Sequence, residues 1–295
     1  MKRTLFMKRQ SLIALFIVCC LVPRPVDATD DMFDSNGVKI RYITEGKGEA
    51  IVLIHGWMSD LDMWGQLDTN PATKEFQLIA LDLRGHGKSD KPHDAAKYDA
   101  EVAADVIRLL DHLKIEKAHL VGYSSGSYVA GKVAATYPNR VRSVVFGGQA
   151  PIIGEVRESD FSEVELFAKL VDEGKDLGEY IRAVSPTESK LTGEQAKAFA
   201  QFAYAGKDVK AFAMAGRGYK KLAVTEEDLK RCKAPMLFIH GGNESDHVKS
   251  KVAAALKTLG RGEFKVIEGG NHMTTLTNLE FGSSIETFLR LGKLE

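Results

Sequence analysis

A serine lies at the centre of the pentapeptide GYSSG, residues 122–126, which matches the pattern G-x-S-x-G. This pattern supports nucleophilic catalysis where the serine occupies a sharp turn from a strand into a helix, because the glycines then relieve the crowding around it. An apolar run at 118–123 precedes the serine, and a helical pattern at 125–137 follows it. In that context we predict that Ser124 is a nucleophile rather than a simple N-cap residue of the helix.

A serine hydroxyl is a weak nucleophile at neutral pH and needs a base that removes its proton. His272 follows the tripeptide GGN at 269–271, directly after a strand-like run at 264–268. This order places the imidazole at a strand-to-helix junction on the sheet edge that carries Ser124. We therefore predict His272 as the general base, in preference to a capping or core histidine.

The loop GGNESDH at 241–247 contains two acids that could orient the base, as a catalytic triad requires. Glu244 lies three residues after Gly241, which is the usual spacing for an acid on such a loop. Asp246 has the more usual residue type but lies two residues further on. The spacing favours Glu244, and Asp246 is the alternative. With either acid the chain order is serine, acid, histidine.

The oxyanion of a tetrahedral intermediate needs hydrogen-bond donors. We expect one donor to be the backbone N–H of Ser125, which follows the nucleophile at the start of the helix. The second is the N–H of Trp57, in the loop after a strand-like run at 50–55, where Gly56 lets the chain turn tightly. Tyr123, which precedes the nucleophile, is expected to contact the substrate.

The elements that position these residues alternate between apolar strands and helices. Residues 32–46 predict a hairpin with an Asn-Gly turn at 36–37. Near-continuous apolar strands separated by helices indicate a parallel sheet that is covered on both faces. The predicted strands are 50–55, 76–82, 118–123, 141–146, 236–240 and 264–268, and the predicted helices are 98–113, 125–137, 247–259 and 273–291.

The alternation breaks between residues 151 and 231, a stretch rich in charge and helical in pattern. We interpret it as a helical insertion, with 29–150 and 232–295 forming the α/β core. Its apolar residues could pack only on one another. Because ligands of open α/β sheets bind at the carboxyl ends of the strands, we favour a lid over that edge.

The N-terminus has the layout of a secretory signal peptide. Four basic residues lie within the first nine, an uncharged and mostly apolar run follows at 11–22, and small residues at 26–28 suit signal peptidase. The run of 12 residues is short for a membrane span, which needs about 20. We expect cleavage after Ala28, export to the periplasm or the exterior, and no stable membrane association afterwards. The alternative is an uncleaved membrane anchor.

Composition argues against two other classes of protein. The formal net charge is zero and no long block of one sign occurs, so no nucleic-acid-binding surface is expected. The eight histidines are scattered, with neither HExxH nor CxxC, so no metal site is expected.

After signal cleavage a single cysteine, Cys232, remains, and it cannot form an internal disulfide.

Over roughly residues 34–292 the chain resembles the α/β-hydrolase superfamily, in its lid-bearing serine esterase and haloperoxidase-like branch. The resemblance rests on HGW at 55–57, DLRGHGKS at 82–89, GYSSG, the acid loop and His272. It implies an eight-stranded, mostly parallel sheet, no cofactor and an acyl-enzyme mechanism. The segment 82–89 is interpreted as a structural turn. A serine nucleophile argues against epoxide hydrolases and haloalkane dehalogenases, which resemble this fold but use aspartate there.

Together these features predict hydrolysis of a carboxylic ester of small or medium size, a small-molecule substrate. Other chemistry of the same triad stays open, because fold does not determine reaction. The alternatives are cleavage of a carbon–carbon bond, a lactone or an amide, and peracid formation. A non-catalytic ligand-binding protein on the same scaffold is the alternative outside enzymes.

Overall fold

The computed structural model describes residues 29–65, 75–185 and 191–294. The predicted signal peptide, residues 1–28, lies outside the described residues. None of the helices within the described ranges is long and apolar enough to cross a membrane.

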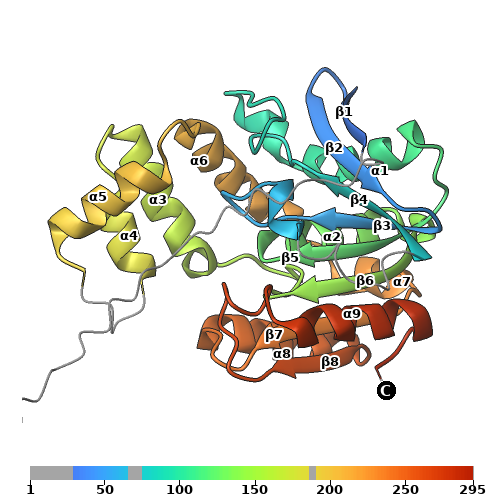
Figure 1. Ribbon diagram of the computed structural model, residues 1–295. Coiled ribbons are helices and arrows are strands. Elements are labelled where there is room, and N and C mark those ends of the chain that lie inside the picture. The colour runs from blue at the N-terminus through green and yellow to red at the C-terminus, as the bar shows by residue number, and fades with distance from the viewer. Residues whose placement is uncertain (1–28, 66–74, 186–190, 295) are drawn as a thin grey trace, which may run out of the picture.

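An eight-stranded sheet forms the centre of the molecule (Figure 1). Its order is β1-β2-β4-β3-β5-β6-β7-β8, with β1–β2 and β2–β4 antiparallel and all other pairs parallel. This confirms the predicted mostly parallel sheet. The strands are β1 (Thr29–Asp34), β2 (Lys39–Glu45), β3 (Glu49–Ile54), β4 (Phe76–Leu81), β5 (Ala118–Tyr123), β6 (Val141–Gly147), β7 (Met236–Gly241) and β8 (Glu263–Ile267).

The first two strands form the hairpin that the Asn-Gly pair predicts. Asn36 and Gly37 have positive φ angles of 57° and 76°, and the N–H of Ser35 donates to the carbonyl of Val38 across the turn. Asparagine and glycine adopt this left-handed conformation at little cost, which explains their place here. The hairpin adds the antiparallel edge of the sheet.

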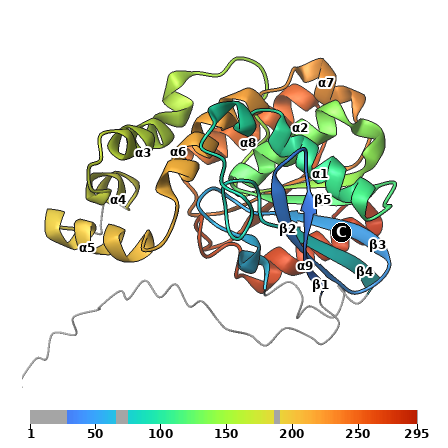
Figure 2. The same cartoon turned by 90° about the horizontal axis from the view of Figure 1, so that it is seen from above.

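Helices cover both faces of the sheet (Figures 1 and 2). In β3, Val52 and Ile54 belong to the core cluster that includes α1 (Glu101–His112), α2 (Ser125–Thr136) and α8 (Asp246–Leu259), whereas Ile51 and Leu53 belong to the cluster that includes α9 (Leu279–Leu291). Alternate side chains of a strand point to opposite faces. Two covered faces therefore explain why the strands are apolar at nearly every position. Helix α1 begins three residues later than predicted, because Ala95–Tyr98 forms a separate 3₁₀ turn, η3.

Four helices between β6 and β7 lie beside the sheet rather than on either face (Figures 1 and 2). We call them the helical insertion: α3 (Ser162–Asp172), α4 (Gly178–Val184), α5 (Gly193–Ala203) and α6 (Val209–Gly218). They share a core of their own, which includes Phe167, Ile181 and Phe212. The partly buried Trp57 and Met58 of the α/β core pack against that cluster.

The predicted insertion, residues 151–231, includes one helix that packs elsewhere. Helix α7 (Glu226–Arg231) lies against α2 and α8, and its Leu229 is fully buried in the same core cluster as those helices. It therefore covers the sheet with them. The 3₁₀ turn η7 (Tyr219–Leu222) connects α6 back to this layer and packs on α2.

Candidate active site

Ser124 lies at a sharp turn between β5 and α2, with φ 54° and ψ −127°. A non-glycine residue in this region is strained and is held there by its surroundings. The flanking glycines permit that turn. A Cβ on Gly126 would lie 2.1 Å from the carbonyl oxygen of Ile54, and one on Gly122 would lie 2.4 Å from the carbonyl oxygen of Gly126. The turn presents the partly exposed Ser124 hydroxyl above the end of the sheet.

His272 lies opposite the serine, with its Nε2 atom 2.9 Å from Ser124 Oγ. The loop that carries it is ordered by Asn271, whose side-chain oxygen accepts hydrogen bonds from the N–H groups of Met273 and Thr274, each over 2.9 Å. The imidazole is about one third exposed, with 37% side-chain accessibility. The predicted nucleophile and base are thus brought together at hydrogen-bonding distance.

Glu244 is the acid beside the histidine, with its Oε2 atom 2.9 Å from His272 Nδ1. Its side chain is only 4% exposed, and its Oε1 atom accepts a hydrogen bond from the N–H of Ser245 over 3.1 Å. Asp246, the alternative acid, is exposed in the first turn of α8. An acid there stabilises the helix N-terminus, which is an ordinary structural role.

The loops that carry the acid and the histidine are bonded to each other. The N–H groups of Gly242 and Asn243 donate to the carbonyl oxygens of Ile267 and Gly270, both over 2.8 Å. A Cβ on Gly241 would lie only 2.2 Å from the carbonyl oxygen of Gly270. Glycine at this position therefore allows the close approach that positions the Glu244–His272 pair.

The loop after β3 brings Trp57 beside the nucleophile. A Cβ on Gly56 would lie 3.0 Å from Ser124 Cβ, so a side chain at this position would crowd the serine. The next residue but one, Met58, has a φ angle of 62°, a second strained position beside the site. Within the described part of the chain, the N–H groups of Trp57 and Ser125 have no turn, loop or cap partner in the backbone. Both remain available as donors to a substrate oxygen.

Buried His55 holds that loop in place. Its Nδ1 atom lies 2.7 Å from the carbonyl oxygen of Gly56, and its Nε2 atom accepts a hydrogen bond from the N–H of Leu83 over 2.9 Å. Burial lowers the pKa of His55, so the ring is neutral and can act as donor at one nitrogen and acceptor at the other. The ring thus joins the loop after β3 to the chain after β4.

The DLRGHGKS segment after β4 makes structural contacts. The Asp82 carboxylate accepts hydrogen bonds from the N–H groups of Leu61 and Lys88, over 2.8 and 2.7 Å. The Arg84 guanidinium forms a buried two-point pair with Asp105, at 2.7 and 2.6 Å. These bonds anchor the turn to α1 and η1 (Leu61–Trp64), as expected of a structural turn.

Tyr123 was predicted to contact substrate, but its hydroxyl donates a hydrogen bond to the backbone carbonyl of His272 over 2.7 Å. Its side chain is 3% exposed, and burial, followed by the nearby Glu244 carboxylate, raises its pKa. The hydroxyl therefore holds the histidine loop. The GYSSG pattern carries no signal for this contact, which joins residues 149 positions apart.

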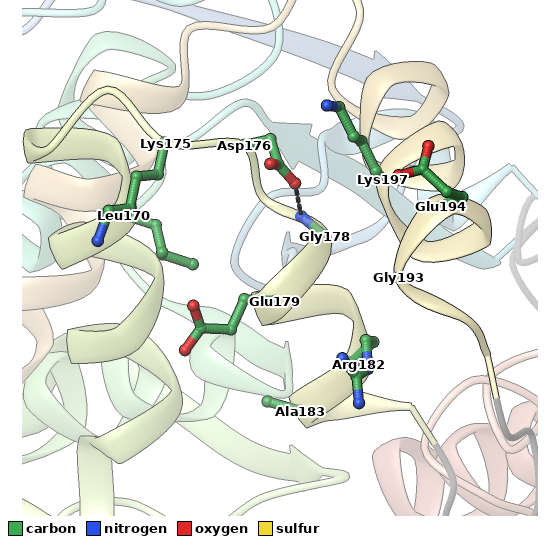
Figure 3. A pocket seen from close by; sticks show the side chains of 10 residues that line it. All are labelled: Leu170, Lys175, Asp176, Gly178, Glu179, Arg182, Ala183, Gly193, Glu194 and Lys197. Atoms are coloured by element: carbon green, nitrogen blue, oxygen red, sulfur yellow. Dashed lines mark hydrogen bonds between the residues drawn. The ribbon is translucent and has the colours of Figure 1, made fainter.

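A cavity of about 850 Å³ lies within the helical insertion, between α3, α4 and α5 (Figure 3). Three basic and three acidic side chains line it, so its walls carry no clear preference for an anion or a cation. They are Lys175, Arg182, Lys197, Asp176, Glu179 and Glu194. None of the residues around Ser124 contributes to this cavity. In the described residues, no group of three or more histidine, cysteine or acidic side chains is arranged to hold a metal ion.

Comparison with known proteins places this geometry in context. The family model described as alpha/beta hydrolase fold matches residues 49–278. The chain is 38% identical over 132 residues to the dihydrolipoyllysine-residue acetyltransferase component of the acetoin cleaving system of Cupriavidus necator, covering 44% of this chain and 34% of that protein. It is 33% identical over 131 residues to an epoxide hydrolase of Caballeronia sordidicola, covering 44% and 40%.

Among solved structures, a carboxylesterase structure from Nitrososphaera gargenis superposes with a TM-score of 0.74 at 20% identity, covering 89% of this chain and 98% of that one. At this identity the match demonstrates a shared fold. The chain spans less than half the length of the two curated relatives named above.

Proposed function

Because this chain belongs to the α/β-hydrolase fold family, we propose that it is a serine hydrolase that cleaves carboxylic esters of small or medium size. One observation carries the proposal: a continuous hydrogen-bonded relay from Glu244 through His272 to Ser124, with both contacts at 2.9 Å. A base within hydrogen-bond reach of a hydroxyl, itself oriented by a carboxylate, is the arrangement that activates a serine.

In the proposed reaction, His272 Nε2 removes the proton of Ser124 as the serine oxygen attacks the ester carbonyl. The N–H groups of Trp57 and Ser125 stabilise the resulting oxyanion, and one such donor is worth about 3 kcal/mol of barrier. His272 then protonates the alcohol oxygen as the ester C–O bond breaks. The alcohol departs, and the acyl group stays bound to Ser124 Oγ as an acyl-enzyme. A water molecule, deprotonated by the same imidazole, hydrolyses this intermediate and restores the serine. The steps require no cofactor.

Glu244 has an orienting role in this proposal. Its carboxylate accepts a hydrogen bond from the Nδ1–H of His272, which leaves Nε2 free to accept the serine proton. The same carboxylate stabilises the imidazolium that forms during attack. Because the side chain is almost fully buried, the interaction is little screened by solvent.

We assign a lid function to the helical insertion. Trp57, whose N–H faces the proposed oxyanion, also packs against Phe167 of α3 with ring centroids 5.3 Å apart. This contact supports a lid that forms part of the acyl-binding region. We propose that residues 29–150 and 232–295 form the α/β core. Helix α7, which belongs to the predicted insertion, packs on this core.

Export is part of the proposal as well. The basic start, the apolar run at 11–22 and the small residues at 26–28 support a signal peptide cleaved after Ala28. The test is the N-terminal sequence and mass of the protein recovered from a bacterial host. A periplasmic or secreted form that begins at Thr29 is expected. Membrane-bound protein that keeps its first residues would instead show an anchor.

The decisive experiment measures p-nitrophenol release from p-nitrophenyl acetate and butyrate by the chain from residue 29 onward. Ser124→Ala is expected to reduce kcat/KM by about a thousandfold or more. Ser250→Ala, which alters an exposed serine on α8, is the matched control and is expected to retain activity. Equal activity of the parent and Ser124→Ala would remove Ser124 from the mechanism.

Labelling separates catalysis from simple binding. A fluorophosphonate should add one adduct to Ser124, identified by mass spectrometry, in a protein that also turns over the esters. Labelling without turnover of any ester would favour the non-catalytic binding protein. Turnover of an epoxide but of no ester would favour the chemistry named for the Caballeronia sordidicola relative.

A further inference from the structure

Ser127, the residue directly after the GYSSG pattern, bridges the ends of two strands. It lies in the first turn of α2 and is fully buried. Its Oγ atom lies 3.1 Å from the carbonyl oxygen of Gly122 in β5 and 3.3 Å from that of Gly147 at the end of β6. The hydroxyl has a single proton, which these two acceptors share. The side chain therefore joins the start of the helix to the edge of the sheet that carries the site.

The carbonyl oxygen of Gly147 also holds the nucleophile. It accepts a hydrogen bond from the backbone N–H of Ser124 over 2.8 Å, in addition to the bond from the Ser127 hydroxyl. The other acceptor of that hydroxyl, Gly122, lies two residues before Ser124. The hydroxyl thus fastens the chain on both sides of a residue with φ 54°, a strained conformation that persists only where its surroundings enforce it.

The backbone after Gly147 lies close to the general base. A Cβ on Gly148 would lie 3.3 Å from His272 Cε1 and 3.0 Å from Tyr123 Cζ. The N–H of Gly148 donates to the carbonyl oxygen of Ile239 in β7 over 2.8 Å, which fixes this part of the chain to the sheet. Two consecutive glycines therefore form a support that meets the nucleophile through the first residue and lies beside the imidazole through the second.

The contact between Ser124 Oγ and His272 Nε2, at 2.9 Å, depends on that support. A base removes a proton efficiently only within hydrogen-bond reach, about 2.6–3.2 Å between heavy atoms. A displacement of about 1 Å can cost a hundredfold in rate. A bond that holds the serine turn in place is therefore expected to affect the rate of attack.

We propose that Ser127 is a positioning residue for the nucleophile, because its hydroxyl holds the Ser124 turn against Gly147 and so maintains the distance to His272. This inference rests on the proposed ester hydrolysis and deepens it by naming a residue that determines how fast the serine attacks. Ser127 is fully buried, so it acts through the backbone rather than on the ester. Loss of the hydroxyl should slow the attack of Ser124 on the carbonyl and leave ester binding unchanged.

The test is single-turnover release of p-nitrophenol from p-nitrophenyl acetate, with the chain from residue 29 onward in excess over the ester. The limiting rate then measures acylation of Ser124, and its dependence on protein concentration gives the dissociation constant of the ester. Ser127→Ala is expected to slow acylation by about tenfold, with an unchanged dissociation constant. Ser127→Cys, which carries a weaker hydrogen-bond donor, is expected to lose only about threefold.

A matched control separates positioning from stability. Ser143 lies on the same strand as Gly147, is 2% exposed, and has its Oγ atom 2.7 Å from His119 Nδ1. Ser143→Ala and Ser127→Ala each remove one buried hydroxyl, so urea denaturation is expected to show similar losses of unfolding free energy. Only Ser127→Ala is expected to slow acylation.

Three outcomes would overturn the inference. Acylation by Ser127→Ala within about twofold of the parent would show that the hydroxyl does not position the serine. Equal slowing by Ser143→Ala would assign the effect to lost stability. A larger dissociation constant with an unchanged acylation rate would assign Ser127 a role in binding the ester.

Failure of the proposed function gives a different result. If the parent cleaves no p-nitrophenyl ester, ester hydrolysis is wrong, and the rate of fluorophosphonate labelling at Ser124 then compares the variants, because labelling needs only an activated serine. Labelling of Ser127→Ala about tenfold slower than labelling of Ser143→Ala would support the positioning role. Equal labelling rates would overturn it.

Discussion

The indole Nε1–H of Trp57 donates a hydrogen bond to the backbone carbonyl of Phe212 over 2.8 Å. This bond joins the loop after β3 to helix α6 of the insertion. The same indole contacts Phe167 and Tyr180, with ring centroids 5.3 and 6.2 Å away. One residue therefore supplies a proposed oxyanion donor through its backbone and fastens the insertion through its side chain. The position of the helical insertion and the position of the proposed donor are therefore expected to be coupled.

Trp57→Phe tests that coupling, since it keeps an aromatic ring but removes the indole N–H. We expect kcat to fall by about tenfold, the worth of one hydrogen bond that positions a catalytic group. Amide hydrogen exchange should become faster in α6, because the insertion loses the hydrogen bond from Trp57 that joins it to the core. Trp64→Phe is the control: the Trp64 indole is buried, and its Nε1–H has no partner among the described residues. Equal exchange in the two variants would show that the Trp57 bond does not hold the insertion.

The second prediction concerns Glu244 and Asp246, the two acids of the loop after β7. Glu244→Gln preserves the shape of the side chain but removes its charge and can present an N–H donor to His272 Nδ1. An imidazole that accepts at Nδ1 carries its proton on Nε2 and cannot remove the serine proton, so kcat is expected to fall by about ten-thousandfold. Asp246→Asn changes an exposed side chain and is expected to leave kcat within about twofold, since solvent weakens the electrostatic effect of an exposed charge. Steady-state kinetics on one p-nitrophenyl ester measures both. A larger loss in Asp246→Asn would exchange the roles of the two acids.

The fold and three of the site positions follow from local sequence patterns. The turn at Ser124 needs glycines two residues away on each side, and His272 lies in the short loop after the last strand, so short-range spacing predicts both. Spacing also favoured Glu244, but the contact with His272 depends on how two loops approach through Gly241 and Gly270, which no local pattern describes.

Other contacts join residues that are far apart in the chain, and no sequence pattern predicts them. The bond between Trp57 and Phe212 spans 155 positions, and the bond between Tyr123 and His272 spans 149. Tyr123 was predicted from its place beside Ser124 to meet the substrate, whereas burial turns its hydroxyl toward the protein. Local spacing thus identifies reactive groups, and only tertiary packing identifies the groups that hold them.

Tyr123→Phe tests this positioning role. The phenylalanine fills the same space, but the backbone carbonyl of His272 loses its donor, and the histidine loop gains freedom. We expect kcat to fall by about fivefold to tenfold, as one positioning hydrogen bond would imply. KM should change little if the hydroxyl serves only to hold the backbone of His272. A raised KM with unchanged kcat would instead support direct contact with substrate, the role first predicted from the sequence.

Buried His86 predicts how stability depends on pH. The residue is 1% exposed, its Nδ1 atom lies 3.0 Å from the carbonyl oxygen of Arg84, and its Nε2 atom has no partner among the described groups. Burial, followed by the neighbouring His55, lowers its pKa from 6.5 to about 3. The folded protein therefore keeps this ring neutral at pH values where the unfolded chain protonates it.

Acid should consequently favour the unfolded state. The stability that neutral His86 contributes is complete above about pH 6.5 and declines as the pH falls toward about 3, by about 1.4 kcal/mol per pH unit. Between pH 6.5 and 5 this amounts to about 2 kcal/mol of unfolding free energy. His86→Gln retains a hydrogen-bonding side chain but cannot titrate, so its unfolding free energy should depend less steeply on pH in that window. Some slope should remain, because burial also lowers the pKa of His55 and His119.

Urea denaturation at pH 5, 6 and 7 measures this difference. His247→Gln, which replaces an exposed histidine of α8, serves as the matched control and should retain the parental slope. The comparison uses slopes rather than absolute stabilities, so a constant loss of stability in His86→Gln does not affect it. If His86→Gln and the parent lose the same free energy between pH 7 and pH 5, His86 is not the buried neutral group that its burial and its contact with the His55 ring imply.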